Sequence, residues 1–120
     1  MLRCSRIDKR GFVAKVADFG LSKVTLAGVA RFDDWEGQAQ YMAPECLDDE
    51  ARLASDVFSF GVLLFECVSG HHAFAEFLPA QLRSLAERCM QREPEARPSF
   101  RQVAEELRRQ DAEAKAAHRA

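Results

Sequence analysis

The sequence predicts a mainly α-helical chain with a short β-hairpin at its N-terminal end. Apolar residues run almost without interruption over Val57–Val68, and helical spacing of apolar residues recurs over residues 79–108, whereas strand-like segments lie only before residue 18. Of the 120 residues, 48% are apolar and 30% are charged, which is the composition of a folded globular protein. The net charge of −2 lacks the basic excess of a nucleic-acid-binding protein, so we expect no nucleic-acid partner.

Residues 1–17 predict the hairpin. Met1–Cys4 is the expected first strand, and Phe12–Val16 is the expected second strand because it alternates and contains β-prone residues. Ile7–Gly11 lies between them and is expected to turn, since Gly11 can take a positive φ without strain.

Residues 18–44 show no sustained hydrophobic period. Glycines and a proline interrupt them at Gly20, Gly28, Gly37 and Pro44. A loop of this length in a compact domain is usually either functional or disordered. A short helix is expected at Glu45–Glu50, directly after Pro44.

The helix expected at Val57–Val68 is apolar on nearly all sides, which predicts that it is buried in the middle of a domain. Ser55-Asp56 is its expected N-cap, and Gly70 is the residue expected to end it.

Two further helices are expected after it. Pro79 begins the first, whose apolar face is Leu82, Leu85, Ala86, Cys89 and Met90. Ser99 and Gln102 have the spacing of a capping box at the start of the second. The apolar face of that second helix is Phe100, Val103, Ala104 and Leu107. The residues after Gln110 are expected either to extend this helix into solvent or to fray.

The cysteines are Cys4, Cys46, Cys67 and Cys89. Because they form no Cys-x-x-Cys pair, we expect reduced, mostly buried thiols and no zinc site. His71-His72 could in principle bind a metal, but adjacent loop residues rarely both do so. The N-terminal residues lack the apolar stretch of a secretory signal, and no apolar run reaches the roughly 20 residues that span a bilayer. We therefore expect a cytoplasmic chain with no membrane contact.

Four motifs occur in one order: Asp18-Phe19-Gly20, Tyr41-Met42-Ala43-Pro44-Glu45, Ser55–Val62 and Arg97-Pro98-Ser99-Phe100. Together they resemble the motifs of the protein kinase superfamily over residues 1 to about 108, and the sequence of Lys15–Lys23 is especially similar. The ending at Glu95–Phe100 resembles the tyrosine-kinase-like branch, whereas Tyr41–Glu45 is more typical of serine/threonine specificity. The resemblance implies the later part of a kinase large lobe.

The resemblance also implies roles for single residues. Asp18, in the motif with Phe19 and Gly20, would bind the Mg²⁺ that bridges the phosphates of ATP. Glu45 would form a buried ion pair with Arg97, and Asp56 would orient the catalytic loop. From the residues alone, Asp18 could be a turn residue and Asp56 a simple N-cap.

The implied division of residues 1–108 is a hairpin (1–17), an activation segment (18–45), a central buried helix (55–69) and C-terminal helices (79–108), followed by a charged tail at 109–120. Ser22 and Thr25 lie in the implied activation segment and are candidate phosphorylation sites.

The sequence contains no glycine-rich loop, no strand lysine in a Val-Ala-x-Lys context and no His-Arg-Asp catalytic loop. We therefore expect a fragment of an ATP-dependent protein kinase that binds no cofactor tightly and is inactive alone. The alternative is a kinase-like binding module or pseudokinase that binds a protein partner, either through apolar surface left exposed on the central helix or through residues 18–45. Gly37 is followed by Gln38 where serine/threonine kinases usually carry threonine, which puts substrate handling in doubt.

Overall fold

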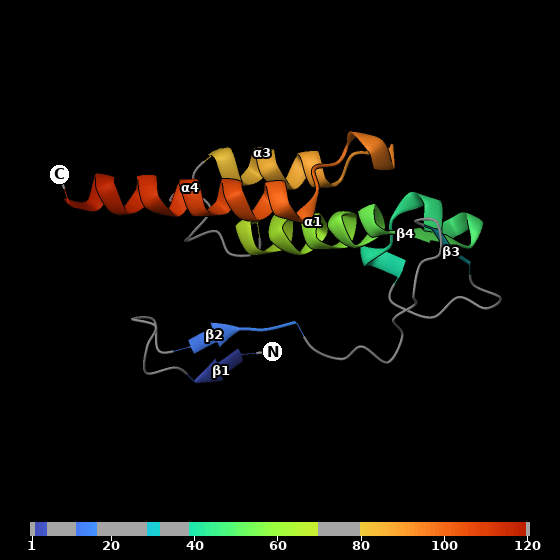
Figure 1. Cartoon of the computed structure of the whole chain (residues 1–120), viewed down its shortest axis with the longest axis horizontal. Coiled ribbons are helices and arrows are strands. Elements are labelled where there is room, and N and C mark those ends of the chain that lie inside the picture. Colours follow the sequence, from blue (N-terminus) through green and yellow to red (C-terminus); the bar gives the residue numbers. More distant parts are fainter. Residues whose placement is uncertain (1, 5–11, 17–28, 32–38, 70–79, 120) are drawn as a thin grey trace.

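Three helices form the body of the protein. The structure is a computed structural model, and it describes residues 2–4, 12–16, 29–31, 39–69 and 80–119. The helices α1 (Leu53–Ser69), α3 (Ala80–Cys89) and α4 (Phe100–Arg119) lie side by side, and each runs opposite to the one before it (Figure 1). The predicted fold class, mainly α with a short N-terminal β-hairpin, is confirmed.

The hairpin consists of β1 (Leu2–Cys4) and β2 (Phe12–Ala14). They pair antiparallel, with Leu2 opposite Ala14 and Cys4 opposite Phe12. Figure 1 shows the hairpin apart from the three helices. Its strands are shorter than the sequence predicts, and the expected turn at Ile7–Gly11 lies outside the described residues.

A second strand pair was not predicted. The three-residue strand β3 (Val29–Arg31) pairs antiparallel with β4 (Glu50–Arg52), and Ala30 lies opposite Ala51. Strands this short show no alternation in a sequence, so the pairing leaves no local signal. This pairing joins β3, which lies within the loop predicted at residues 18–44, to β4, which directly precedes α1.

Two single-turn 3₁₀ helices lie between these strands in the sequence: η1 (Ala39–Tyr41) and η2 (Pro44–Asp48). The short helix predicted after Pro44 is therefore present, in 3₁₀ form. Asp49 ends it with a left-handed backbone, φ 59°, a conformation that aspartate tolerates better than most residues. We call residues 39–48 the η1–η2 segment.

The core lies where all three helices meet. Val57 of α1, Leu85 and Cys89 of α3, and Val103 of α4 are buried, and Phe60, Leu64 and Leu107 pack against them. The closest approach is at Gly61 of α1, where a Cβ atom would lie 2.6 Å from Cys89 Cβ. Glycine is needed here because any side chain would push α1 and α3 apart.

The C-terminal helix begins as predicted. The Ser99 N–H donates to Gln102 Oε1 (2.8 Å), and the Gln102 N–H donates to Ser99 Oγ (3.2 Å), so the capping box is confirmed. Because α4 continues to Arg119, the tail extends the helix rather than fraying. Arg88 of α3 pairs with Glu106 of α4 and adds a polar contact beside the core.

The start of α1 differs from the prediction. The helix begins at Leu53, so Ser55 and Asp56 lie in its first turn and are not its N-cap. Ser55 Oγ instead accepts a hydrogen bond from the N–H of Arg52, the residue before the helix (2.9 Å). The local pattern of Ser-Asp before an apolar run marks the region correctly but predicts the first helical residue at Val57, four residues late.

The predicted burial of this helix on all sides is also wrong. Leu63 is 51% exposed and Phe65 is 38% exposed, so α1 buries one face and leaves apolar side chains on another. This agrees with the expectation that part of its apolar surface stays exposed. Among the cysteines whose side chains the structure describes, Cys46 and Cys89 are buried free thiols and Cys67 is exposed, which agrees with the expectation of mostly buried thiols. Within the described ranges, no helix combines the length and apolarity needed to cross a membrane.

Candidate functional site

The structure brings together three of the residues singled out from the sequence. Glu45, Asp56 and Arg97 come from η2, α1 and the loop after η3 (Pro94–Ala96), and they meet around the start of α1. The Asp18-Phe19-Gly20 motif lies outside the described residues. So do Ser22, Thr25 and His71-His72.

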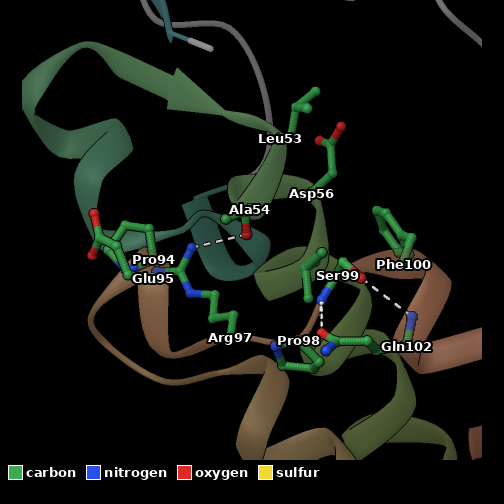
Figure 2. A pocket seen from close by; sticks show the side chains of 11 residues that line it. Leu53, Ala54, Asp56, Pro94, Glu95, Arg97, Pro98, Ser99, Phe100 and Gln102 are labelled. Atoms are coloured by element: carbon green, nitrogen blue, oxygen red, sulfur yellow. Dashed lines mark hydrogen bonds between the residues drawn. The ribbon is translucent and has the colours of Figure 1, made fainter.

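Arg97 is the centre of this site, and its guanidinium donates all five of its hydrogens. Nε donates to the Gln91 carbonyl (2.7 Å). Nη1 donates to Glu45 Oε1 (2.7 Å) and to the Ala54 carbonyl (2.9 Å), the bond drawn in Figure 2. Nη2 donates to Glu45 Oε2 (2.9 Å) and to the Arg92 carbonyl (3.1 Å). With the side chain 0% exposed, these five bonds replace the water that burial removes.

The Glu45 carboxylate is matched to this guanidinium. It forms a bidentate salt bridge with Arg97, and its Oε1 also accepts a hydrogen bond from Ser55 Oγ (2.7 Å). Burial alone would raise the pKa of Glu45, but the hydrogen bonds from Arg97 and Ser55 and the positive charge outweigh it and lower the pKa to about 2. The face of Phe58 lies beside Arg97, with Cζ 5.0 Å from the ring centroid.

A second set of contacts holds the other end of the η1–η2 segment. Ser59 Oγ donates to the Tyr41 carbonyl (2.7 Å), and Tyr41 Oη donates to Glu66 Oε2 (2.9 Å). The hydrogen bond to Glu66 and the charge of that carboxylate raise the pKa of Tyr41. Sequence reasoning missed Ser59 and Glu66, and the one available signal was the presence of polar residues within an otherwise apolar helix.

A pocket of about 520 Å³ lies between the start of α1 and the loop that carries Arg97 (Figure 2). Leu53, Pro98 and Phe100 supply apolar walls, and Asp56 and Glu95 are its acidic residues. Burial raises the pKa of Asp56. In the part of the chain that the structure describes, no residue forms a hydrogen bond or ion pair with the Asp56 carboxylate.

These contacts can hold a backbone segment in place, but they supply no reacting group. Among the described residues, no three His, Cys, Asp or Glu side chains lie close enough together to hold a metal ion. The site is therefore an anchor that fastens the η1–η2 segment to the helical core.

Comparison with known proteins gives the family. The family model described as protein kinase domain matches residues 6–77. The chain is 33% identical to a probable serine/threonine-protein kinase of Dictyostelium discoideum, in a match that covers 78% of this chain and 7% of that protein. It is 32% identical to serine/threonine-protein kinase CTR1 of Arabidopsis thaliana, covering 85% of this chain and 15% of that one. It is 30% identical to dual specificity protein kinase shkE of D. discoideum, covering 78% and 17%.

The matched region thus spans less than a fifth of each of these relatives. The family model nevertheless covers more than half of the present sequence, including the Asp18-Phe19-Gly20 motif, Glu45 and the whole of α1. The chain belongs to the protein kinase family, of which it contains part of the large lobe.

Proposed function

We propose that the chain is part of an ATP-dependent protein kinase that phosphorylates serine or threonine, and that these 120 residues do not transfer phosphate alone. The observation that carries this proposal is the buried Glu45–Arg97 pair, with N–O distances of 2.7 and 2.9 Å. It fastens the end of residues 18–45, the proposed activation segment, to the helical core. A segment that presents a protein substrate needs such a fixed end, because phosphoryl transfer depends on positioning.

The proposed roles follow the family resemblance. Asp18, with Phe19 and Gly20 beside it, binds Mg²⁺ through a carboxylate, the ligand type that this ion prefers. When bound, Mg²⁺ neutralises charge on the phosphates of ATP. Asp56 orients the catalytic loop, and Ser22 and Thr25 are sites of regulatory phosphorylation. The serine/threonine assignment is supported by two of the relatives named above, which are called serine/threonine kinases.

The proposed inactivity of the isolated chain has a physical reason. The printed sequence contains no glycine-rich loop, strand lysine or His-Arg-Asp loop. One carboxylate cannot hold ATP in line with a hydroxyl group without those parts.

The test is a transfer assay with γ-³²P-labelled ATP, Mg²⁺, a protein substrate and the purified chain. Incorporation is expected to equal that of an Asp18→Ala control, and transfer that depends on Asp18 would contradict the proposal. Should the coding sequence before Met1 continue as an open frame with a His-Arg-Asp loop, its longer product is expected to transfer phosphate and to lose this activity in Asp18→Ala.

A second candidate function is a kinase-like module that binds a protein partner. The exposure of Leu63 (51%) and Phe65 (38%) on α1 favours it, since apolar side chains gathered on one surface are typical of interaction sites. A stop codon directly before Met1, together with a cellular protein of this size, would support it. A longer, active product would argue against it.

A further inference from the structure

We propose that the pocket between the start of α1 and the loop that carries Arg97 binds a planar cation, a guanidinium or amidinium group, carried on an apolar body. At about 520 Å³ the pocket is large enough for a small organic ligand. The inference goes beyond the proposed role of Asp56 toward a catalytic loop, because the printed sequence contains no such loop. It concerns a ligand that reaches the pocket from outside the chain.

The Asp56 carboxylate supplies the charge that such a ligand needs. It lines the pocket and is exposed, so a ligand can reach it. Among the described residues, none forms a hydrogen bond or ion pair with it, and its partial burial raises the pKa of Asp56. A cation bonded to this carboxylate would offset the cost of that burial.

The other polar groups of the pocket wall already have partners. The Arg97 guanidinium donates all five of its hydrogens, and Glu45 balances its charge. Ser99 Oγ and Gln102 Oε1 accept the two hydrogen bonds of the capping box, drawn in Figure 2. The pocket therefore offers an anion no unpaired guanidinium.

The sign of the charge around the pocket also favours a cation. The N-terminal ends of α1 and α4 adjoin it, and each contributes about half a positive charge. Asp56 and Glu95 each carry a full negative charge, so the two carboxylates outweigh the two helix ends. Of the two, Glu95 is 74% exposed and lies 3.9 Å from Arg52, which makes Asp56 the stronger candidate for the bond.

The walls select the rest of the ligand. Leu53 is 71% exposed and Phe100 is 47% exposed, so both keep apolar surface against which a flat body can pack. Figure 2 shows these two side chains and Asp56 projecting away from Arg97 on one side of the pocket. A guanidinium or amidinium presents two parallel N–H groups to a carboxylate. A guanidinium is also less strongly hydrated than an ammonium, so it loses less when it enters an apolar pocket.

The test is a titration of the isotope-labelled full chain, followed by the chemical shifts of its backbone amides. Benzamidine is the cationic probe, and benzamide has the same shape without the charge. Shifts are expected at Leu53–Val57 and Ser99–Gln102, which line the pocket or adjoin it. Benzamidine should bind more tightly than benzamide on the order of tenfold, the usual effect of hydrogen bonds to a charged group. This comparison needs no substitution in the protein.

Substitutions assign the charge to one residue. Asp56→Asn keeps the shape of the side chain, so it should remove the preference for benzamidine and leave the affinity for benzamide unchanged. Glu95→Gln is the matched control, since it makes the same kind of change in the other acidic residue of the wall. It should alter the affinity by less than about twofold. Leu53→Ser should weaken both compounds alike. Circular dichroism at 222 nm checks that each variant is folded.

A peptide separates two sources of the same cation. Acetyl-phenylalanyl-arginine amide carries a guanidinium beside an aromatic group, and its citrulline counterpart lacks the charge. A preference for the arginine peptide would assign the pocket to an arginine of a protein partner, whereas binding of benzamidine alone would assign it to a small aromatic cation.

Three results would overturn the proposal. They are equal affinity for benzamidine and benzamide, an undiminished preference for benzamidine in folded Asp56→Asn, and no shift at the pocket with any probe. The measurement needs no kinase activity, so its failure is distinguishable from a failure of the phosphate-transfer assay.

Discussion

Replacing Glu45 with glutamine is the most direct test of the anchor, because it leaves the fully buried Arg97 guanidinium without a counter-charge. Breaking one partner of a buried pair costs about 3–5 kcal/mol. The fall in the pKa of Glu45 from 4.5 to about 2 gives an independent figure, since about 1.4 kcal/mol per pKa unit amounts to roughly 3 kcal/mol. The two routes agree, so we expect Glu45→Gln to lower the free energy of unfolding by about 3 kcal/mol at pH 7.

The assay is urea unfolding followed by circular dichroism at 222 nm, at pH 7 and at steps below pH 5. Because the folded-state pKa of Glu45 lies below its unfolded value, the stabilisation is complete above about pH 4.5 and is lost as the pH falls toward 2. The unsubstituted chain should therefore lose this stability in acid, whereas Glu45→Gln has none of it to lose. The gap between the two curves should narrow below about pH 4.5 and close near pH 2.

The matched control is Glu95→Gln, two residues from Arg97. Glu95 is 74% exposed and lies 3.9 Å from Arg52, so its removal should change stability by less than about 0.5 kcal/mol. The reasoning is refuted if Glu45→Gln is as stable as the Glu95→Gln control at pH 7. It is also refuted if the gap between the Glu45→Gln and unsubstituted curves stays constant in acid.

Substitutions at three further positions test the helix packing, the helix cap and the exposed apolar surface. Gly61→Ala should lower the melting temperature, because the new Cβ would lie 2.6 Å from Cys89 Cβ. Overpacking of this kind costs about 1–3 kcal/mol, whereas the higher helix propensity of alanine contributes about 1 kcal/mol. A higher melting temperature would contradict this. Ser99→Ala should cost about 1 kcal/mol in urea unfolding by removing the Oγ that accepts from the Gln102 N–H, whereas Ser99→Asp, which keeps an N-cap acceptor, should not. Leu63→Ser should reduce binding of a hydrophobic dye while leaving helix content unchanged, since this side chain is 51% exposed; unchanged dye binding would show that the dye binds elsewhere.

Local patterns predicted what local interactions determine. The capping box of Ser99 and Gln102 joins residues three positions apart, so the sequence contains the whole of it. The buried face of α3 at Leu85, Ala86 and Cys89 follows from helical spacing in the same way. The pairing of β3 with β4 depends on contacts distant in sequence, and no local pattern indicated it.

The candidate site was only partly predictable for the same reason. Glu45 and Arg97 are 52 residues apart and were paired through the family resemblance, not through spacing. Ser55 was expected to cap a helix, because Ser before an apolar run is typical of an N-cap. Its hydroxyl is instead engaged by Glu45 and by the Arg52 N–H, and the helix begins earlier. The contacts of Tyr41 with Ser59 and Glu66 depend on how the segment folds back onto α1.

The length of chain between Glu45 and Arg97 has a consequence for synthesis on the ribosome. Translation at about 5–20 residues per second adds the intervening 52 residues in roughly 3–10 seconds. Until then the Glu45 carboxylate has no guanidinium to bind, so the anchor lacks its ion pair while the rest of the chain emerges. Two of the carbonyls that Arg97 binds belong to its near neighbours Gln91 and Arg92, so the loop that carries Arg97 can form early. The Glu45–Arg97 ion pair, which joins residues distant in sequence, then forms last. Contacts that form after the folding transition state chiefly slow unfolding. The Glu45–Arg97 ion pair therefore helps to determine how long the folded protein survives proteolysis.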